Sequence, residues 1–529
     1  MRTWKWKKKP ELCLSKTLIT KLCVSVALAM LFVVSDAVEV AADTGTSRFL
    51  RVGLESHFRE RSQITIYSHT LAVGHFSADN FHVSGHLTAE TSFVARPDNS
   101  AYIRLGYSFL SLTRAQDMAT SYAGAIPALM GNGTWGLYFP VEDAPRYGYA
   151  VPVSSSRVSL SVGGQIVLIS DNVATNLQIR DTQGITSLGV RQYRGIIEFA
   201  RFGGNLLTAV NIVDIEEYLL SVVPAEMPPG WHMEALKAQA VAARTYTVFR
   251  LGSLAHRGYD LCDTTFSQVY LGVASEHANT TAAVNDTRGI MIYYDGRPIE
   301  AVYSSSSGGF TENSENVWME ARPYLRAVAE IYEPNAMVWS RSFTLTQLTG
   351  LLASRNINIG SVTSMQLSVS ANGRVQEVTF MGVSGSHTVR SEAIRSFFTP
   401  SLESRNFTIT GGTVTSATVG DSPVMLHIQS AVGVSQANLA NMHVMRQPGV
   451  ALPLQGNIAV RWMGGIGNIH NQPTQSGSII TSTGYQIELS GRGWGHGVGM
   501  SQHGAQGMAL RGYNFIQILQ HYYTGVEIR

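Results

Sequence analysis

The chain is poor in cysteine and in charged side chains. It has 529 residues, only three of them cysteines, and Lys, Arg, Asp and Glu together make up 14%. Cys13 and Cys23 lie near the N-terminus, so the rest of the chain keeps only Cys262. A single thiol excludes an internal disulfide framework there, and a hydrophobic core must provide the stability.

Features that favour nucleic-acid or phosphate binding are also missing. The formal net charge is +2, and no basic stripe with interleaved aromatic residues occurs in the body of the chain. We therefore expect no nucleic-acid partner. A glycine-rich stretch at 491–505 lacks the Gly-Lys-Ser/Thr ending of a phosphate-binding loop.

What is present describes a globular, turn-rich protein. Hydrophobic residues make up 44% and glycine accounts for 50 positions, which argues against a disordered or coiled-coil chain. The length allows two to four domains at the usual prior of roughly one per 100 to 200 residues.

Residues 1–42 have the features of an export signal. Lys and Arg side chains up to Lys21 precede the apolar run Leu22–Val34, which is short for a membrane span. Small residues at 35–37 and 40–42 suit cleavage. We expect an exported, extracytoplasmic protein, with an uncleaved N-terminal anchor as the alternative.

Residues 43–150 are predicted to form a small N-terminal α+β region. Alternating stretches at 63–67 and 71–73 suit short strands, and a strand at 101–109 precedes a helix at 112–122. This strand–helix order resembles the peptidoglycan-binding SPOR repeat, with an ordinary α+β connector as the alternative.

From residue 151 the pattern predicts a sheet and then two helices. The predicted strands are 158–162, 166–169, 196–200 and 206–213. Asp214 suits a helix N-cap with Glu217 as its capping partner, and Pro224 should end that helix. The second helix, Met233–Arg250, has a face of small residues that suits burial behind a site; they are Leu236, Ala240, Ala243 and Thr247.

Glu226 lies at the junction between these two helices. A carboxylate held between packed helices is partly desolvated, which raises its pKa and suits it to act as a general acid near neutral pH. The alternative is that Glu226 is an ordinary solvated loop residue.

The rest of the chain alternates helices, strands and polar loops. A helix is predicted at 274–287, strands at 290–294 and 299–303, and helices from about 506 and at 515–522. Residues 304–309 read Ser-Ser-Ser-Ser-Gly-Gly, which is either a flexible loop or a hydrogen-bonding surface for a polyhydroxylated ligand. Residues of about 407–483 suggest a β-rich elaboration. The fold class is therefore mixed α/β (α+β), with sheet segments around a central helical pair.

Several of these stretches together resemble the SpoIID/LytB family, the stage II sporulation protein D and amidase-enhancer group. The resemblance rests on 193–195, 214–227, 234–246, 303–309 and 493–505 within the region 151–529. It implies a catalytic domain with lytic transglycosylase activity on peptidoglycan glycan strands stripped of stem peptides. It assigns the catalytic glutamate to Glu226 and a place at the cell wall or the outer face of the cytoplasmic membrane.

The remaining site residues are expected to bind substrate. They are Arg244, Tyr303, Ser304, Ser305, Ser306, Trp494, His496, Gln502 and His503. Some family members are thought to bind zinc through one His and two Cys. Here His256 and Cys262 are present, but Phe266-Ser267 stands where the second thiol is expected, so no metal or other cofactor is predicted.

A single candidate acid suits a lytic transglycosylase, in which a sugar hydroxyl replaces water, because ordinary glycosidases need a second carboxylate. The alternative is a non-catalytic wall-binding enhancer of an N-acetylmuramoyl-L-alanine amidase, whose partners would be that amidase or other sporulation wall hydrolases. A serine hydrolase using Ser304–Ser307 is disfavoured, because no Gly-x-Ser-x-Gly elbow surrounds them.

Overall fold

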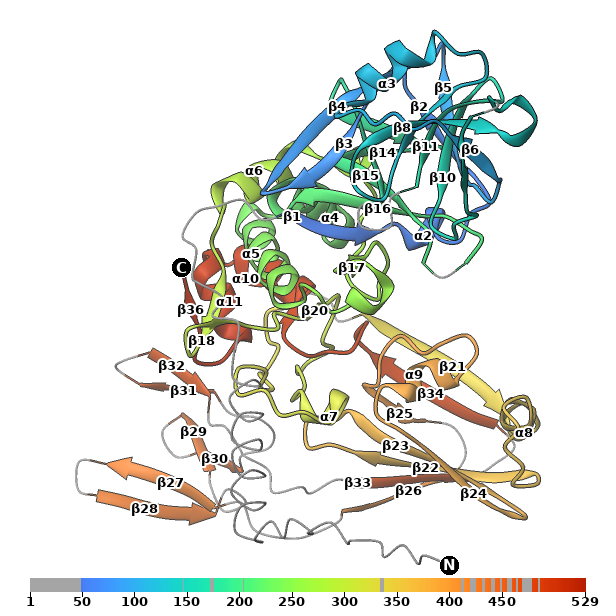
Figure 1. Cartoon of the computed structure of the whole chain (residues 1–529). Coiled ribbons are helices and arrows are strands. Elements are labelled where there is room, and N and C mark those ends of the chain that lie inside the picture. The colour runs from blue at the N-terminus through green and yellow to red at the C-terminus, as the bar shows by residue number, and fades with distance from the viewer. Residues whose placement is uncertain are drawn as a thin grey trace, which may run out of the picture. The chain divides into compact units, whose positions relative to one another are not determined.

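The computed structural model describes residues 49–529, with gaps at 146, 172–175, 203 and 334–336. Between 411 and 485 it describes only the backbone of several strands. All described residues belong to the unit Arg48–Arg529, and the predicted leader, residues 1–42, lies outside them. Helices and several sheets occur together in this unit, so the fold is mixed α+β, as predicted (Figure 1).

A seven-stranded sheet contains the first described strand in its interior. Its spatial order is β17 (Leu261–Cys262), β1 (Phe49–Gly53), β16 (Thr208–Asp214), β15 (Ile196–Ala200), β12 (Leu177–Asp181), β3 (Thr70–Ser77) and β4 (Asn80–Thr88). Strand β1 runs antiparallel to β16, with Phe49 opposite Asp214, and parallel to β17. Every residue of β15 is buried, as expected for an apolar strand covered on both faces.

A second sheet has ten strands and also mixes early and late segments. Its order is β14 (Arg191–Arg194), β13 (Ile185–Leu188), β2 (Ile64–Tyr67), β5 (Ser92–Pro97), β10 (Val158–Val162), β11 (Gln165–Ser170), β7 (Ile126–Leu129), β8 (Trp135–Pro140), β6 (Tyr102–Arg104) and β9 (Tyr149–Val151). Short helices α2 (Glu55–Phe58), α3 (Leu112–Ala119) and η1 (Val141–Asp143) connect strands of these sheets, and η2 (Ala255–Arg257) precedes β17.

The predicted region 43–150 therefore has no sheet of its own. Strand β3 pairs with β12, and β5 pairs with β10, so strands from both sides of residue 150 alternate in each sheet. The strand and helix thought to resemble a SPOR repeat, β6 and α3, belong to this shared structure, since β6 pairs with β8 and β9.

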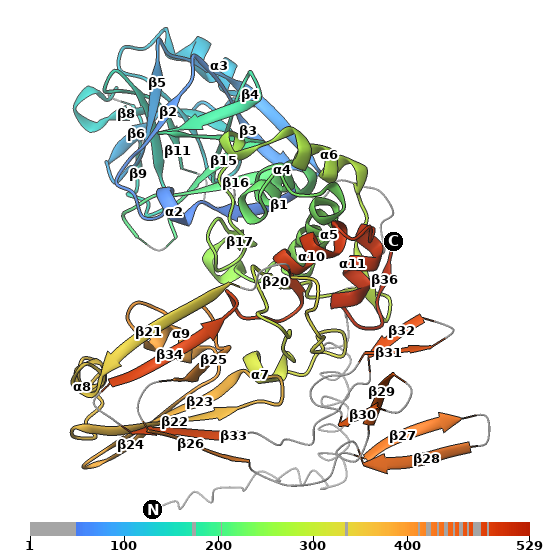
Figure 2. The ribbon, with the colours of Figure 1, turned by 180° about the vertical axis from the view of Figure 1, so that it is seen from behind.

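A helical group follows the sheets. Helix α5 (Met233–Phe249) packs against α4 (Ile215–Glu226), α6 (Ala278–Asp286), α10 (Gln502–Ala509) and α11 (Phe515–Tyr522). The two views of Figures 1 and 2 show α5, α10 and α11 side by side. The predicted small face of α5 is buried throughout, at Leu236, Ala240, Ala243 and Thr247. Around this group lie η3 (Val273–Ser275) and the small sheet β19 (Arg297–Pro298), β18 (Ile292–Tyr294) and β36 (Glu527–Ile528).

The β-rich part begins earlier than predicted, near residue 338 rather than 407. One sheet contains β21 (Val338–Thr344), β34 (Gln486–Arg492) and β25 (Phe407–Ile409). Another contains β24 (Gly385–Arg390), β23 (Val375–Gly382), β22 (Val362–Val369), β33 (Ser478–Thr483) and β26 (Thr413–Thr418). Helices α7 (Glu315–Trp318), α8 (Leu345–Ala353) and α9 (Ala393–Phe397) belong to residues 304–409.

Three separate hairpins complete the strands of the predicted elaboration. They are β27 (Met425–Ser430) with β28 (Gly433–Asn438), β29 (His443–Gln447) with β30 (Val450–Pro453), and β31 (Ala459–Trp462) with β32 (Gly465–Asn468).

The three largest hydrophobic cores among the described residues correspond to these parts of the molecule. The first lies under the two large sheets and α4, the second surrounds α5, α10 and α11, and the third fills the sheets between 338 and 489. Tyr303 packs against both the first and the second core. The boundary between these two cores is therefore where α4 ends and where the candidate site lies.

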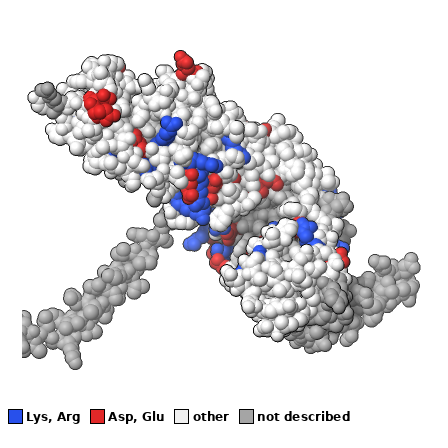
Figure 3. All heavy atoms as spheres, turned by 90° about the vertical axis from the view of Figure 1, so that its right-hand side faces the viewer, with Lys and Arg blue, Asp and Glu red and all other residues white. Residues whose placement is uncertain are grey.

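The face drawn in Figure 3 carries few charged side chains, in line with the composition. On the face drawn in Figure 3, Lys and Arg side chains lie beside Asp and Glu side chains, and most of the face carries neither. Among the residues that the structure describes, no helix is long and apolar enough to cross a membrane.

Candidate active site

Glu226 is the last residue of helix α4, not a loop residue. Asp214 caps the start of the helix as predicted, but its carboxylate accepts from the Glu216 N–H (2.7 Å) and no capping box forms with Glu217. The prediction that Pro224 ends the helix is wrong, because α4 continues through Pro224 to Glu226.

Packing explains why the helix passes the proline. Val222 and Val223 are fully buried, and the Met227 N–H donates to the Val223 carbonyl at 3.0 Å to complete the last turn. Proline costs a helix one hydrogen bond and some strain, which tertiary burial of neighbouring side chains can offset. Glu226 therefore has a fixed backbone in a helical turn.

The Glu226 carboxyl lies in a desolvated setting. Burial raises its pKa above the ordinary 4.5, and a hydrogen bond from the Val269 N–H to Oε1 (2.9 Å) partly opposes that shift. Among the described residues, no cation contributes to the shift. Burial without a cationic partner favours the protonated form, which is the state a general acid needs.

A chain of hydrogen bonds holds Tyr303 against the loop whose Val269 N–H donates to Glu226. Its hydroxyl donates to Gln268 Oε1 (2.8 Å), and Gln268 Nε2 donates to Thr247 Oγ1 (2.8 Å) on α5. The pKa of Tyr303 is well above 10, first through burial and then through the charge of Glu226. The phenol therefore stays protonated beside the carboxyl.

Gln502 also lies beside Glu226, but it holds the backbone. Its Nε2 donates to the Glu226 carbonyl (2.9 Å) and to Gln239 Oε1 (3.3 Å), and its side chain is buried. This contact fixes the end of α4 against the start of α10. We therefore interpret Gln502 as a positioning residue.

The structure brings the two predicted loop segments together. We call residues 304–309 the Ser-rich loop and residues 493–499 the Gly-rich loop. Strand β20 (Tyr303–Ser304) runs parallel to β35 (Met500–Ser501), Ser306 and Trp494 exchange backbone hydrogen bonds at 3.1 and 2.9 Å, and the His503 N–H donates to the Ser305 carbonyl at 3.0 Å. The two loops therefore form one backbone unit next to Tyr303.

His496 belongs to this unit as a neutral side chain. Burial lowers the pKa of its imidazole to about 4. Its Nδ1 accepts from the Val498 N–H at 3.0 Å, so Nε2 carries the proton. The ring lies 5.1 Å from the ring of Trp318, while the His503 ring lies 4.8 Å from Trp231.

The predicted substrate-binding residues differ in their access to solvent. Trp494 is 50% exposed, and Tyr303, Ser305, His496 and His503 are partly exposed. Ser304 and Ser306 are buried within the loop unit, at 8% and 0%. In this arrangement Ser306 helps to build the loop, and Trp494 is the most accessible of the predicted contacts.

Arg244 lies away from these loops and needs a correction. Its guanidinium forms two hydrogen bonds of 2.7 Å with the Glu216 carboxylate and also donates to the carbonyls of Val284 and Ile290. Both side chains are nearly fully buried. Arg244 therefore joins α5 to α4 and α6, and Glu216 is its partner rather than a solvated residue.

Sequence reasoning missed Gln268 and the Val269 N–H. Both lie in a loop that follows β17, and both act on the site through single hydrogen bonds to Tyr303 and Glu226. The only available signal was the isolated Gln-Val-Tyr stretch at 268–270.

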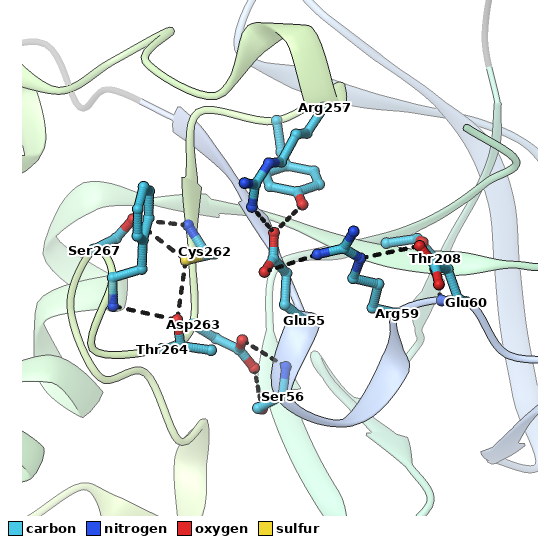
Figure 4. Close-up of polar contacts among 12 residues, drawn as sticks. Glu55, Ser56, Arg59, Glu60, Thr208, Arg257, Cys262, Asp263, Thr264 and Ser267 are labelled. Carbon is cyan, nitrogen blue, oxygen red and sulfur yellow. Dashed lines mark hydrogen bonds and ion pairs between the residues drawn. The ribbon is translucent and has the colours of Figure 1, made fainter. Parts of the chain in front are cut away.

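The residues considered for zinc lie close to this loop. Cys262 is buried, and its Sγ lies 3.2 Å from Thr264 Oγ1 and 3.4 Å from Ser267 Oγ (Figure 4). His256 is exposed on η2. Within the described ranges, no three His, Cys, Asp or Glu side chains gather closely enough to hold a metal ion. The hydroxyls around Cys262 do not fit a tetrahedral zinc site.

Further hydrogen bonds join residues 257–263 to helix α2. The Asp263 carboxylate accepts from the Ser56 N–H (2.9 Å) and hydroxyl, and Glu55 accepts from Tyr259 and Arg257 (Figure 4). The loop that supplies Gln268 and Val269 is therefore anchored to helix α2.

Comparison with known proteins shows which families this chain is similar to. The model of the family "Stage II sporulation protein" (SpoIID) matches residues 204–294, which include Glu226 and Gln268. The amidase enhancer of Bacillus subtilis (strain 168) is 31% identical over 396 residues, covering 72% of this chain and 50% of that protein.

Two further relatives cover more of their own length. An uncharacterized protein of Brachyspira hyodysenteriae is 28% identical over 382 residues, which are 72% of this chain and 82% of that protein. The stage II sporulation protein D of Bacillus amyloliquefaciens is 28% identical over 335 residues, which are 60% of this chain and 75% of that protein. The chain spans only half the length of the amidase enhancer. The family model over residues 204–294 and these relatives show that the chain is similar to proteins of the SpoIID/LytB family.

Proposed function

We propose that this protein cleaves peptidoglycan glycan strands as a lytic transglycosylase, with Glu226 as the general acid. The observation that carries the proposal is the Glu226 carboxyl at the end of α4, which accepts a hydrogen bond from the Val269 N–H and whose pKa burial raises. The family matches support the coarser statement, a role related to sporulation and the cell wall.

The reaction needs one group that gives and then takes a proton. Protonated Glu226 donates to the glycosidic oxygen, the bond from that oxygen to the anomeric carbon breaks, and the sugar's own C6 hydroxyl oxygen bonds to that carbon. The hydroxyl proton then returns to the Glu226 carboxylate, and a 1,6-anhydro end results. Among the described residues, no second carboxylate contributes to the pKa shift of Glu226, which fits a mechanism with one carboxyl group.

The loop unit next to Glu226 supplies chemistry that suits a glycan. Trp494 presents an exposed indole that can stack on the apolar face of a sugar ring, and Tyr303 and Ser305 add hydroxyls. His496 and His503 add ring nitrogens within the same unit. We expect the glycan to lie across this unit.

Substitution of Glu226 tests the assignment. Glu226→Gln keeps the shape and removes the proton, so cleavage should fall about a hundredfold to ten-thousandfold while binding of glycan strands persists. Mass spectrometry of products from purified, peptide-free strands should show 1,6-anhydro ends for the wild type. The matched control is Glu217→Gln, which changes a half-buried carboxyl near the other end of the same helix.

Two results would defeat the proposal. One is a Glu226→Gln variant that cleaves as fast as wild type. The other is a set of wild-type products with ordinary reducing ends only.

The second candidate function is a non-catalytic enhancer of a cell-wall amidase. It is favoured by the relative named amidase enhancer, the one relative cited above that reaches 31% identity. This function predicts no glycan product from the purified protein and a faster release of stem peptides when a wall amidase is added. Both functions require the protein to act outside the cytoplasmic membrane, which fractionation of cells checks directly.

A further inference from the structure

Helix α7 presents a second exposed indole beside the loop unit. Its last residue, Trp318, is 41% exposed, although its neighbour Val317 is buried in the second core. The Trp318 ring lies 5.1 Å from the ring of His496, two residues after Trp494 in the Gly-rich loop. The indole therefore lies against the same loop as Trp494.

An unusual number of strong contacts fixes this four-residue helix. Arg326 binds the Glu315 carboxylate through two hydrogen bonds of 2.8 and 2.6 Å. Buried Arg405 donates to the Asn316 carbonyl at 3.1 Å, and Asn316 donates to buried Glu312 at 3.0 Å. Arg326, Arg405 and Glu312 thus hold a helix whose exposed last side chain is apolar.

The backbone directly after Trp318 is also strained. Met319 has φ 63° and ends the helix in the left-handed region, which non-glycine residues rarely adopt, and its side chain is 87% exposed. Strain of this kind persists only where the surroundings enforce it, and it is frequent at ligand-binding sites. Among the described residues, none accepts a hydrogen bond from the Trp318 indole nitrogen, so this donor is available to a ligand.

We propose that Trp318 is a sugar-stacking residue of the glycan site, which binds a ring of the strand distant from the bond that is cleaved. This inference rests on the proposed function, because it assumes that the ligand is a glycan. Trp318 meets the loop unit at His496 in the Gly-rich loop, whereas Glu226 lies at the end of α4, which Gln502 holds after that loop. In this proposal Trp318 binds a sugar other than the two that flank Glu226, so that long strands, which reach both places, bind more tightly.

A preorganised aromatic platform gains affinity because little side-chain freedom is lost on binding. The ring of Trp318 is already ordered by its contact with the His496 ring and by the hydrogen bonds that fix helix α7. Its contribution should appear in binding of the whole strand and hence in KM, while the chemical step at Glu226 is unaffected.

Binding is tested without turnover by using the Glu226→Gln background and peptide-free peptidoglycan glycan strands. Adding Trp318→Ala should weaken binding about tenfold, and Trp318→Phe should restore most of it, because a planar ring is kept. The matched control is Tyr67→Ala, which removes a 53% exposed aromatic side chain from β2. In the otherwise wild-type protein, Trp318→Ala should raise KM on long strands and leave kcat near its normal value.

Unchanged affinity of the folded Trp318→Ala variant would overturn the inference, and so would a Trp318→Phe variant as weak as Trp318→Ala. These outcomes are separate from the fate of the proposed function. If Trp318→Ala loses binding and the wild type does not cleave strands, Trp318 is a glycan contact but Glu226 is not a catalytic acid. Normal 1,6-anhydro products from the wild type, together with unaltered binding by Trp318→Ala, would keep the catalytic assignment and remove the Trp318 contact.

Discussion

The Glu226 side chain is partly exposed, and the shift of its pKa is upward. Burial is the largest cause of its raised pKa, and the Val269 N–H only partly opposes it. Because the acid must carry a proton to act, the active form exists below this pKa, and a raised pKa extends the active range upward.

We therefore expect kcat/KM to fall on the alkaline side of a midpoint above 4.5, the ordinary pKa of this carboxyl. A pH profile of strand cleavage measures it. The Glu217→Gln control should keep the same alkaline limb, because Glu217 lies near the start of α4. A flat profile from pH 4 to 9 would contradict the role of Glu226 as an acid.

Glu330 is a buried carboxyl, and it should make stability depend on pH. Burial raises its pKa from 4.5 to about 7, although Tyr522 donates to it at 2.6 Å. Because the pKa of Glu330 is raised in the folded state, the contribution of this group to the free energy of unfolding is fully present below pH 4.5. That contribution is lost as the pH rises through about 7. The loss is on the order of 3 kcal/mol, from 1.36 kcal/mol per pKa unit.

Urea unfolding at several pH values between 4 and 8 measures this slope. Glu330→Gln should flatten it across that range, whereas Glu377→Gln, which changes an exposed carboxyl on β23, should leave it unchanged. A wild-type free energy of unfolding that rises between pH 5 and 7 would argue against this assignment.

At the scale of elements, helix α10 packs closely against the Glu330 side chain. A Cβ at Gly504 would lie 2.0 Å from Glu330 Oε2 and 2.0 Å from the Tyr522 hydroxyl. Both atoms are buried and mutually hydrogen-bonded, so neither can move cheaply.

We expect Gly504→Ala to destabilise the protein by roughly 1 to 3 kcal/mol, the usual cost of overpacking. Gly350→Ala is the matched control, because Gly350 lies in helix α8 and a Cβ there meets no atom within 4 Å. That change should stabilise by about 0.4 to 1 kcal/mol. Chemical denaturation of both variants checks the opposite signs, and equal effects would show that the contact with Glu330 is unimportant.

Sequence patterns located the elements with strong local signals. Helix α11 has the predicted bounds Phe515–Tyr522, strands β10 and β15 match 158–162 and 196–200, and α5 ends one residue before the predicted Arg250. These segments combine high intrinsic propensity with clear stops. Local pattern failed at Pro224, where burial of the valines before it outweighs the preference of proline against helix.

Long-range pairing was beyond any local signal. No property of Phe49–Gly53 reveals that this strand lies between β16 and β17, and no property of Arg244 reveals that Glu216 neutralises it. The candidate acid was predictable because proline and two helices surround it in sequence. Val269, which donates to this acid, and Gln268, which accepts from Tyr303, were not predictable, because a loop brings them to the site.

At the scale of the whole molecule, Arg374 connects the β-rich part to the candidate site. It is fully buried, and its guanidinium donates to the carbonyls of Ser307 (2.6 Å) and Phe310 (3.1 Å). Gly497 has φ 76°, and a Cβ there would lie 2.0 Å from the guanidinium. One side chain from the residues before β23 thus supports both the Ser-rich and the Gly-rich loop.

We expect Arg374→Met to lower both the melting temperature and strand cleavage, because buried carbonyls lose their donor, at a cost of roughly 1 to 3 kcal/mol. The control Arg390→Ala removes an exposed ion pair with Glu377 and should change stability by less than about 1 kcal/mol. Calorimetry and a product assay on both variants measure the difference. Equal behaviour of the two variants would show that the loops do not depend on this support.

The parallel pairing of β20 with β35 has a consequence for the order of events during synthesis. Glu226 and Tyr303 emerge early, whereas Met500 and the Gly-rich loop emerge only after the whole β-rich part. A partly synthesised chain therefore contains Glu226 but lacks the Gly-rich loop. Under the proposed activity, a nascent chain cannot attack the glycan it is being delivered to, and proteolytic loss of the last few dozen residues is a simple way to switch the mature protein off.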